Sequence, residues 1–378
     1  MIGNLDYSTL QHIWWIIASL VGSLFLFLTF VQGGQTLLFT VPRDDDEKAL
    51  IINSLGRKWE LTFTTLVLFG GALFAAFPKF YATSFGGAYW VWMLILFTFI
   101  IQAVSYEYRK KPLNFLGSTT YEAFLFVNGS VGILLIGAAV GTFFTGSSFS
   151  LNDYNQVTWQ TPYRGLEAAK NLFNLSLGLF LVFNARVLGA MYLVNNIDHK
   201  TLTDRCRKSA WKSFLWSLPF LLYVLANLLF MKGYARNPET GEIFLQSGKY
   251  LQNLLGNPAT LALLLLGLLL VIYAVAITCF KGKNNGIWFG GIGTVLVGLA
   301  VFFLAGFNNT AFYPSSYDLQ SSLTIYNASS SHYTLTAMTY VALSVPFVLA
   351  YIAYVWRQMD SKRLTIAELK SENAEEMY

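Results

Sequence analysis

Six polar side chains lie within or at the edge of long apolar runs in this 378-residue sequence. They are Gln32, Gln35, Glu60, Glu107, Glu122 and Arg186. Charged groups are costly inside a bilayer, so ionisable residues in apolar spans are candidates for function. Carboxylates and amides that are joined by water can relay protons. Because all six map to the same half of the membrane, we predict that they contribute to a proton path.

Most of these residues also have a structural explanation. Glu60 and Glu122 lie near predicted helix N-termini, where the helix dipole favours a carboxylate. Thr119 and Glu122 also have the spacing of a capping box. Three basic residues follow Glu107 closely, so a surface ion pair explains that carboxylate equally well. Arg186 differs because it lies too deep to reach water easily, so we expect it to face protein and to pair with an acid.

The sequence holds few groups that could bind a heme or a metal. Its three histidines, His12, His199 and His332, fall near predicted membrane surfaces or in a loop. A heme needs an axial ligand in a dry pocket. Cys206 and Cys279 lack the spacing of metal ligands and are expected to be free thiols. We therefore expect no heme, metal or catalytic residue in this chain, which on its own should be inactive.

The composition indicates an all-α, polytopic membrane protein. Hydrophobic residues make up 55% of the chain and charged residues 12%, whereas soluble domains carry about 25% charged residues. A membrane span needs about 20 apolar residues. Nine spans are predicted, at residues 10–39, 59–81, 88–108, 118–144, 166–194, 209–231, 259–280, 286–307 and 333–356. We expect a single transmembrane domain over residues 1–359 and a short polar cytoplasmic tail over 360–378.

The basic residues predict the orientation of these spans. With the N-terminus outside, 18 of the 25 Lys and Arg residues fall in inner segments and six in outer ones, and Arg186 lies within a span. Inner loops of membrane proteins are enriched in Lys and Arg. The pattern therefore predicts an outer N-terminus and a cytoplasmic C-terminus. The net charge of +5 does not indicate nucleic-acid binding, because the basic residues lie in short clusters beside apolar runs.

Several short stretches resemble subunit II of the cytochrome bd-type quinol oxidases, and they occur along nearly the whole chain in the right order. They are IWW at 13–15, INS at 52–54, WE at 59–60, GGALFAAFP at 70–78, YEYR at 106–109, PSS at 314–316, SLT at 322–324 and NASS at 327–330. The run at 70–78 and those of the last outer loop are the most specific. The chain is therefore identified by resemblance as a member of this family.

The resemblance implies a fold of two four-helix bundles plus one peripheral helix. It implies a partner, subunit I, that carries two b hemes, heme d and the quinol site. The complex would oxidise quinol and reduce dioxygen to water in the respiratory chain of a bacterial inner membrane. Subunit II would supply a cytoplasmic proton path. A structural quinone or lipid and a small single-helix accessory subunit are further candidates for binding.

The chain departs from the family pattern at the predicted proton path. The family often has an acidic run of the type DGFDLG at the end of its first helix, where this sequence has FVQGGQ at 30–35. Gln32 and Gln35 thus stand where acids are expected, while Glu60 keeps the acid of the family's WDGN run. Two alternatives stay open: a structural subunit without a proton path, and a secondary transporter. The lack of matched Pro- or Gly-broken spans disfavours the transporter.

Overall fold

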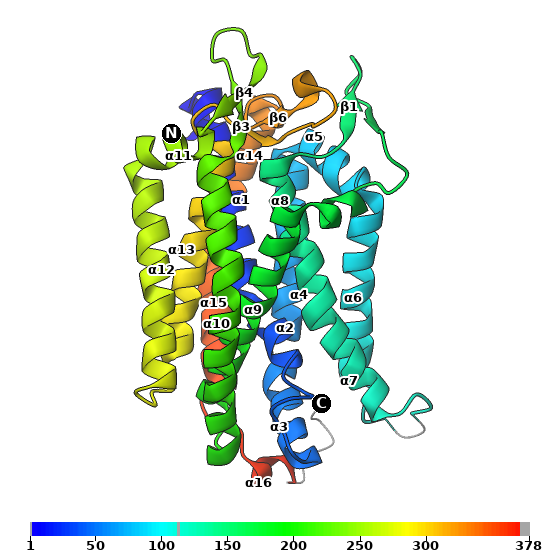
Figure 1. Ribbon diagram of the computed structural model, residues 1–378, viewed down its shortest axis with the longest axis vertical. Helices are drawn as coiled ribbons and strands as arrows, with labels where there is room; N and C mark the ends of the chain where they lie inside the picture. Colours follow the sequence, from blue (N-terminus) through cyan, green and yellow to red (C-terminus); the bar gives the residue numbers. More distant parts are fainter. Residues whose placement is uncertain (1, 112–113, 371–378) are drawn as a thin grey trace.

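The computed structural model describes residues 2–111 and 114–370 and is built around long parallel and antiparallel helices (Figure 1). Within the described residues, nine helical segments are long and apolar enough to cross a membrane. They are Tyr7–Gln35, Asp45–Ala76, Tyr89–Tyr108, Ser118–Thr145, Leu172–Asn196, Lys200–Phe230, Pro258–Cys279, Gly286–Gly306 and His332–Met359. The prediction of nine spans in an all-α membrane protein is confirmed.

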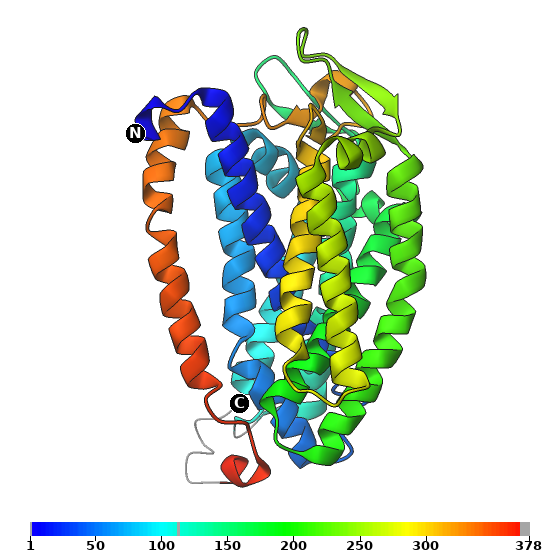
Figure 2. The ribbon, with the colours of Figure 1, turned by 90° about the vertical axis from the view of Figure 1, so that its left-hand side faces the viewer.

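The helices form two groups of four spans and one peripheral span. The first group contains α1 (Tyr7–Leu28), α2 (Phe30–Gln35), α4 (Trp59–Ala76), α6 (Tyr89–Tyr108), α7 (Ser118–Val127), the π-helix η3 (Asn128–Gly132) and α8 (Ile133–Thr145). The second contains α9 (Leu172–Asn196), α10 (Lys200–Phe230), α12 (Pro258–Cys279) and α13 (Gly286–Gly306). The peripheral span is α14 (His332–Ala342) with α15 (Val345–Met359), which stands at one side of the molecule in Figure 2. This arrangement agrees with the fold that the resemblance implied.

Short elements cover both ends of the bundles. We call the end where α1 begins the amino end and the end where α15 finishes the carboxyl end (Figure 1). Three two-stranded antiparallel sheets lie at the amino end: β1 (Phe149–Leu151) with β2 (Val157–Trp159), β3 (Lys232–Arg236) with β4 (Ile243–Ser247), and β5 (Ala311–Tyr313) with β6 (Leu323–Thr324). The short helices are η1 (Ile2–Asn4), α3 (Asp45–Gly56), α5 (Pro78–Tyr81), η2 (Ala82–Gly86), η4 (Leu166–Lys170), α11 (Lys249–Gly256), η5 (Leu319–Ser321) and α16 (Ile366–Leu369).

Capping residues explain where several helices begin. Asp6 caps α1 by accepting a hydrogen bond from the Thr9 backbone N–H at 3.0 Å, and Asn171 caps α9 in the same way. His199 caps α10 through its ring nitrogen, so this helix starts at Lys200, whereas the predicted span starts at residue 209. The additional turns carry charged residues and extend the helix beyond its apolar part. The predicted tail includes α16, and its residues 371–378 lie outside the described residues.

Helix α9 is the most buried of the nine long helices, and small residues let its neighbours approach closely. A Cβ atom on Gly33 of α2 would lie 1.7 Å from the carbonyl oxygen of Ala185 in α9. A Cβ atom on Gly137 of α8 would lie 2.5 Å from the Cα of Gly178 in α9. In lipid, helix association depends on such close packing because the surroundings are as apolar as the side chains. The two glycine contacts therefore fix α9 between α2 and α8.

We expect Gly137→Ala to destabilise the protein, because its new methyl group must displace the backbone of α9. Overpacking of this kind costs about 1–3 kcal/mol, which should lower the midpoint of thermal unfolding in detergent. The matched control is Gly71→Ala in α4, because no described atom lies within 4 Å of a Cβ at that position. Equal unfolding midpoints for the two variants would contradict the importance of the α8–α9 contact.

Candidate functional site

The carboxylate of Glu122 is the best-defined charged group inside the first bundle. Its side chain lies in α7 and the residue is 1% exposed. Arg109 donates two hydrogen bonds to Oε1, from Nε at 3.1 Å and from Nη2 at 2.8 Å. The ammonium nitrogen of Lys48 lies 3.0 Å from Oε2. Two cations from different elements thus compensate one buried carboxylate, which a buried charge requires.

The capping-box explanation of Glu122 is wrong. Helix α7 begins at Ser118, and its N-cap residue Gly117 forms no side-chain cap hydrogen bond. The carboxylate points instead toward the end of α6 and toward α3, where Arg109 and Lys48 lie. Tertiary ion pairs therefore explain its position.

A column of buried polar side chains continues from this end into the first bundle. On α6, the residues Thr98, Gln102 and Tyr106 are spaced by four, so they share one face of the helix. Thr98 lies ten residues before the end of α6 at Tyr108, which places it roughly 15 Å along the helix axis. The column also includes Gln32 and Gln35 of α2 and Asn128 of η3. Gln32 and Gln35, both predicted as path residues, are completely buried.

Two hydrogen bonds connect members of the column. The amide of Gln35 donates to the hydroxyl of Tyr106 at 3.1 Å, and the amide of Asn128 donates to the hydroxyl of Thr98 at 3.4 Å.

The amides of Gln32 and Gln102 have no hydrogen-bond partner among the described residues at either their oxygen or their nitrogen. Buried polar groups in native proteins are almost always hydrogen-bonded. The column therefore needs further hydrogen-bonding groups, and small polar molecules such as water can provide them.

Among the described residues, Arg186 is not paired with an acid, so that part of the prediction is wrong. Its guanidinium donates to the carbonyl oxygen of Thr36 at 2.6 Å, to the hydroxyl of Thr36 at 2.9 Å and to the hydroxyl of Thr40 at 2.9 Å. Thr36 is the C-cap residue of α2. The last carbonyl groups of a helix carry partial negative charge, which favours a cation at this place. The arginine does face protein, as expected, but its hydrogen bonds go to Thr36 and Thr40 and not to Glu122.

Glu60 and Glu107 lie outside the buried column. Glu60 is exposed in the first turn of α4 and borders a cavity of about 550 Å³ at the carboxyl end, together with Arg57 and Glu368. Glu107 is exposed, and its carboxylate lies 3.3 Å from the ammonium nitrogen of Lys111. The surface ion pair therefore accounts for Glu107. Of the three predicted acids, only Glu122 lies at the start of the column.

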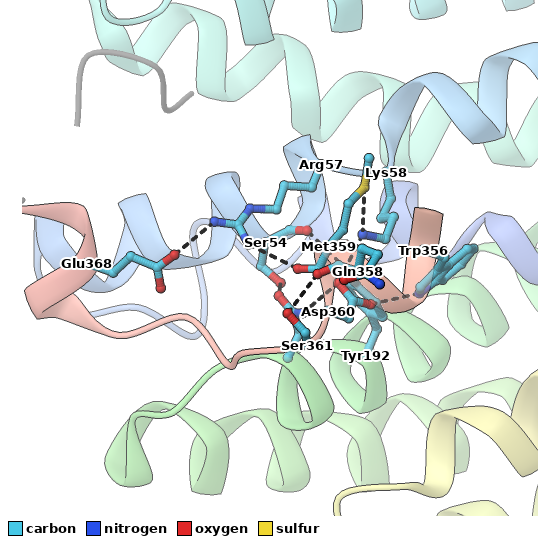
Figure 3. A network of polar contacts seen from close by, with 11 residues as sticks. Ser54, Arg57, Lys58, Tyr192, Trp356, Gln358, Met359, Asp360, Ser361 and Glu368 are labelled. Carbon is cyan, nitrogen blue, oxygen red and sulfur yellow. Dashed lines mark hydrogen bonds and ion pairs between the residues drawn. The ribbon is translucent and has the colours of Figure 1, made fainter. Parts of the chain in front are cut away.

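A second buried network at the carboxyl end, shown in Figure 3, was not predicted. Lys58 is completely buried, and its ammonium nitrogen lies 3.0 Å from Oδ1 of Asp360. Asn196 donates to the same oxygen at 3.1 Å, and the indole of Trp356 donates to Oδ2 at 2.7 Å. These bonds tie the end of α15 to the start of α4 and the end of α9. The sequence could have indicated this network only through the position of Lys58 and Asp360, a base and an acid at the same predicted membrane face.

The histidines lie at the ends of the bundles. His12 donates from Nδ1 to the backbone oxygen of Ser8, and His332 donates from Nε2 to the backbone oxygen of Leu5, both at the amino end. His199 lies at the carboxyl end, with its Nδ1 3.6 Å from the carboxylate of Glu47. Each histidine thus has a local polar contact near a helix terminus.

We expect Glu122→Gln to reduce the amount of folded protein strongly. The substitution leaves Lys48 and Arg109 without their carboxylate, and breaking a buried ion pair costs about 3–5 kcal/mol. The control is Glu107→Gln, whose exposed pair should change stability by less than about 0.5 kcal/mol. Thermal unfolding of the purified variants measures both. A Glu122→Gln protein as stable as the control would show that the ion pairs are not structural.

Comparison with known proteins agrees with this architecture. The chain is 29% identical over 375 residues to cytochrome bd-I ubiquinol oxidase subunit 2 of Escherichia coli (strain K12), covering 94% of this chain and 95% of the relative. It is 25% identical over 371 residues to cytochrome bd ubiquinol oxidase subunit 2 of Bacillus subtilis (strain 168), covering 94% and 98%.

The fold is also similar to a solved structure, the bd oxidase from Geobacillus thermodenitrificans. The TM-score is 0.67 at 15% sequence identity, and the match covers 93% of this chain and 98% of the other. The family model for cytochrome bd terminal oxidase subunit II matches residues 10–359. Since that match includes nearly all of the transmembrane part, the chain belongs to the cytochrome bd terminal oxidase subunit II family.

Proposed function

We propose that this chain is the heme-free subunit II of a quinol oxidase, and that it supports a heme-bearing subunit I in reducing dioxygen to water. Its membership of the family, over residues 10–359, carries the proposal. Relatives in Escherichia coli and Bacillus subtilis are named as subunits of ubiquinol oxidases. The family membership also argues against the secondary-transporter alternative. The purely structural subunit is the alternative that experiments on the buried column must test.

The proposed complex places two b hemes, heme d and the quinol site in subunit I. The assignment of the hemes to subunit I is supported by the three histidines, each of which forms a local polar contact near a helix terminus. Heme ligands instead lie in dry pockets. A structural quinone or lipid and a small single-helix subunit are further candidate partners.

Subunit I would cover the side of the molecule formed by α4 and α15. None of the residues Val345–Met359, all of which the structure describes, is buried. On α4, the exposed side carries Glu60, Thr64 and Gly71 among the large apolar residues Val67, Leu68 and Phe74. Small and polar residues on a span favour contact with another helix over contact with lipid. The exposed side of α4 and the unburied α15 are therefore the surfaces that we propose for the membrane partner.

The proposed proton path is the buried column between Glu122 and Thr98. Amides can both donate and accept, so Gln32, Gln102 and Asn128 can hold a chain of water molecules. Their unpaired buried atoms support this proposal, because such groups otherwise destabilise the fold. The path would open at the carboxyl end, where the basic residues predict the cytoplasm.

The basic residues predict that the carboxyl end faces the cytoplasm and the amino end faces outward. Labelling of single cysteines in a background that carries Cys206→Ala and Cys279→Ala tests this orientation in whole cells. Asp153→Cys, in the loop between β1 and β2, should react with an impermeant reagent added from outside. Ser361→Cys, after α15, should react only after the cells are opened. The opposite pattern would reverse the topology.

Gln102→Leu should slow dioxygen reduction while the heme spectrum of the complex stays unchanged. Losing one hydrogen-bonding group of a relay removes about 1–3 kcal/mol, which corresponds to a rate lower by about five-fold to one hundred-fold. Oxygen consumption by the purified complex measures the effect. The control is Thr294→Val in α13, whose buried hydroxyl also has no hydrogen-bond partner among the described residues but lies in the second bundle. If Gln102→Leu turns over like Thr294→Val and is equally stable, the subunit is structural here.

A further inference from the structure

A wide groove opens at the carboxyl end, on the side of α10 that faces α9, α2 and α7. Its volume is about 600 Å³. One wall is a face of α10, and the other wall comes from Thr36, Thr40, Phe126 and Val182 with their neighbours. Arg186 lies between the two walls. The groove is distinct from the buried column, since it opens to the outside of the bundle.

The groove is strongly basic. Four of its lining residues are cations, namely Arg186, Arg205, Lys208 and Lys212, and in the part of the chain that the structure describes no carboxylate lines it. Arg205 is compensated, because it forms an ion pair with the buried carboxylate of Glu47. Among the described residues, Arg186, Lys208 and Lys212 form no ion pair. These three positive charges around one cavity thus have no carboxylate partner in the described part of the chain, which favours an anionic ligand.

The wall formed by α10 changes from basic to apolar along its length. Residues 205, 208, 212 and 216 are spaced by three or four, so their side chains share one helix face. Trp216, at the far end, is 64% exposed. Phe183 and Val182 of α9 and Phe126 of α7 line the groove beside this apolar part. A ligand with an anionic head and a hydrocarbon chain would match both parts.

The position of the groove fits the surface of a bilayer. The apolar part of α10 is predicted from residue 209, so Lys208 lies where the hydrocarbon region begins and Lys212 lies one turn beyond. Tryptophan is enriched at membrane interfaces, and basic pockets between spans on the inner side bind anionic lipid head groups. We propose that this groove is a binding site for an anionic phospholipid, with its phosphate near Arg186, Lys208 and Lys212 and an acyl chain along Trp216 and Phe183.

The same cations could bind free inorganic phosphate, so the experiment must separate the two sources. The whole complex is reconstituted in nanodiscs of phosphatidylcholine alone, of phosphatidylcholine with phosphatidylglycerol, or of phosphatidylcholine with inorganic phosphate in the buffer. Native mass spectrometry counts the retained phosphatidylglycerol, and the thermal midpoint reports stabilisation. The proposal predicts selective retention of phosphatidylglycerol and a rise of the midpoint with that lipid only.

The double variant Lys208→Gln/Lys212→Gln should bind phosphatidylglycerol about 25-fold more weakly, since each surface cation contributes about five-fold. Lys281→Gln/Lys283→Gln is the matched control, because it removes the same charge from an exposed loop at the same end, outside the groove. Lys208→Arg/Lys212→Arg keeps the charge and should keep the lipid. Both Gln variants change only exposed side chains, so folding should be preserved.

Three outcomes would overturn the proposal. The first is equal retention of phosphatidylcholine and phosphatidylglycerol by the unmodified complex. The second is an equal loss of lipid in the two Gln variants, which would indicate an unspecific surface charge. The third is full stabilisation by inorganic phosphate with no further effect of phosphatidylglycerol, which would make the ligand a free anion.

Discussion

The close approach of α9 to its neighbours is the packing constraint on which the other features depend. Gly33 lets α2 reach the backbone of α9 at Ala185, and Gly137 lets α8 reach it at Gly178. In lipid, apolar side chains gain little by leaving their surroundings, so close backbone contact and polar bonds hold helices together. With α9 of the second bundle fixed against α2 and α8 of the first, the amides of α2 are buried inside the first bundle, and Arg186 of α9 lies in the groove beside the exposed lysines of α10.

This arrangement separates two kinds of positive charge at the carboxyl end. Inside the first bundle, Lys48 and Arg109 are matched by the carboxylate of Glu122, and buried charges are tolerated there because they are paired. Outside it, Lys208 and Lys212 are exposed along the groove, and neither forms an ion pair with a described residue. The matched charges stabilise the fold, whereas the unmatched ones are available to a ligand.

The fold was largely predictable, but the partners of the site residues were not. The length of the apolar runs alone predicts the nine spans, because each helix that crosses a bilayer needs about 20 apolar residues. Glu122 was recognised as a buried acid, yet Lys48 and Arg109 belong to other elements, and sequence spacing carries no information on such pairs. An acidic partner was predicted for Arg186, because charge complementarity was the only guide that the sequence offered. Its real partners are hydroxyl and carbonyl groups at the end of α2. Gln102 was not predicted as a path residue, because a single amide in an apolar run is equally consistent with a role in helix packing.

The exchange of acids for amides decides how the buried column can work. Gln32 and Gln35 are neutral, so burying them costs far less than burying carboxylates. They can orient water, but they cannot release a proton themselves. The column's own carboxylate, Glu122, is held by two cations, and giving up its charge would leave both of them unmatched. In the proposed path, protons would therefore move along water oriented by the amides and by Tyr106, and Glu122 would fix the entrance electrostatically instead of carrying the proton.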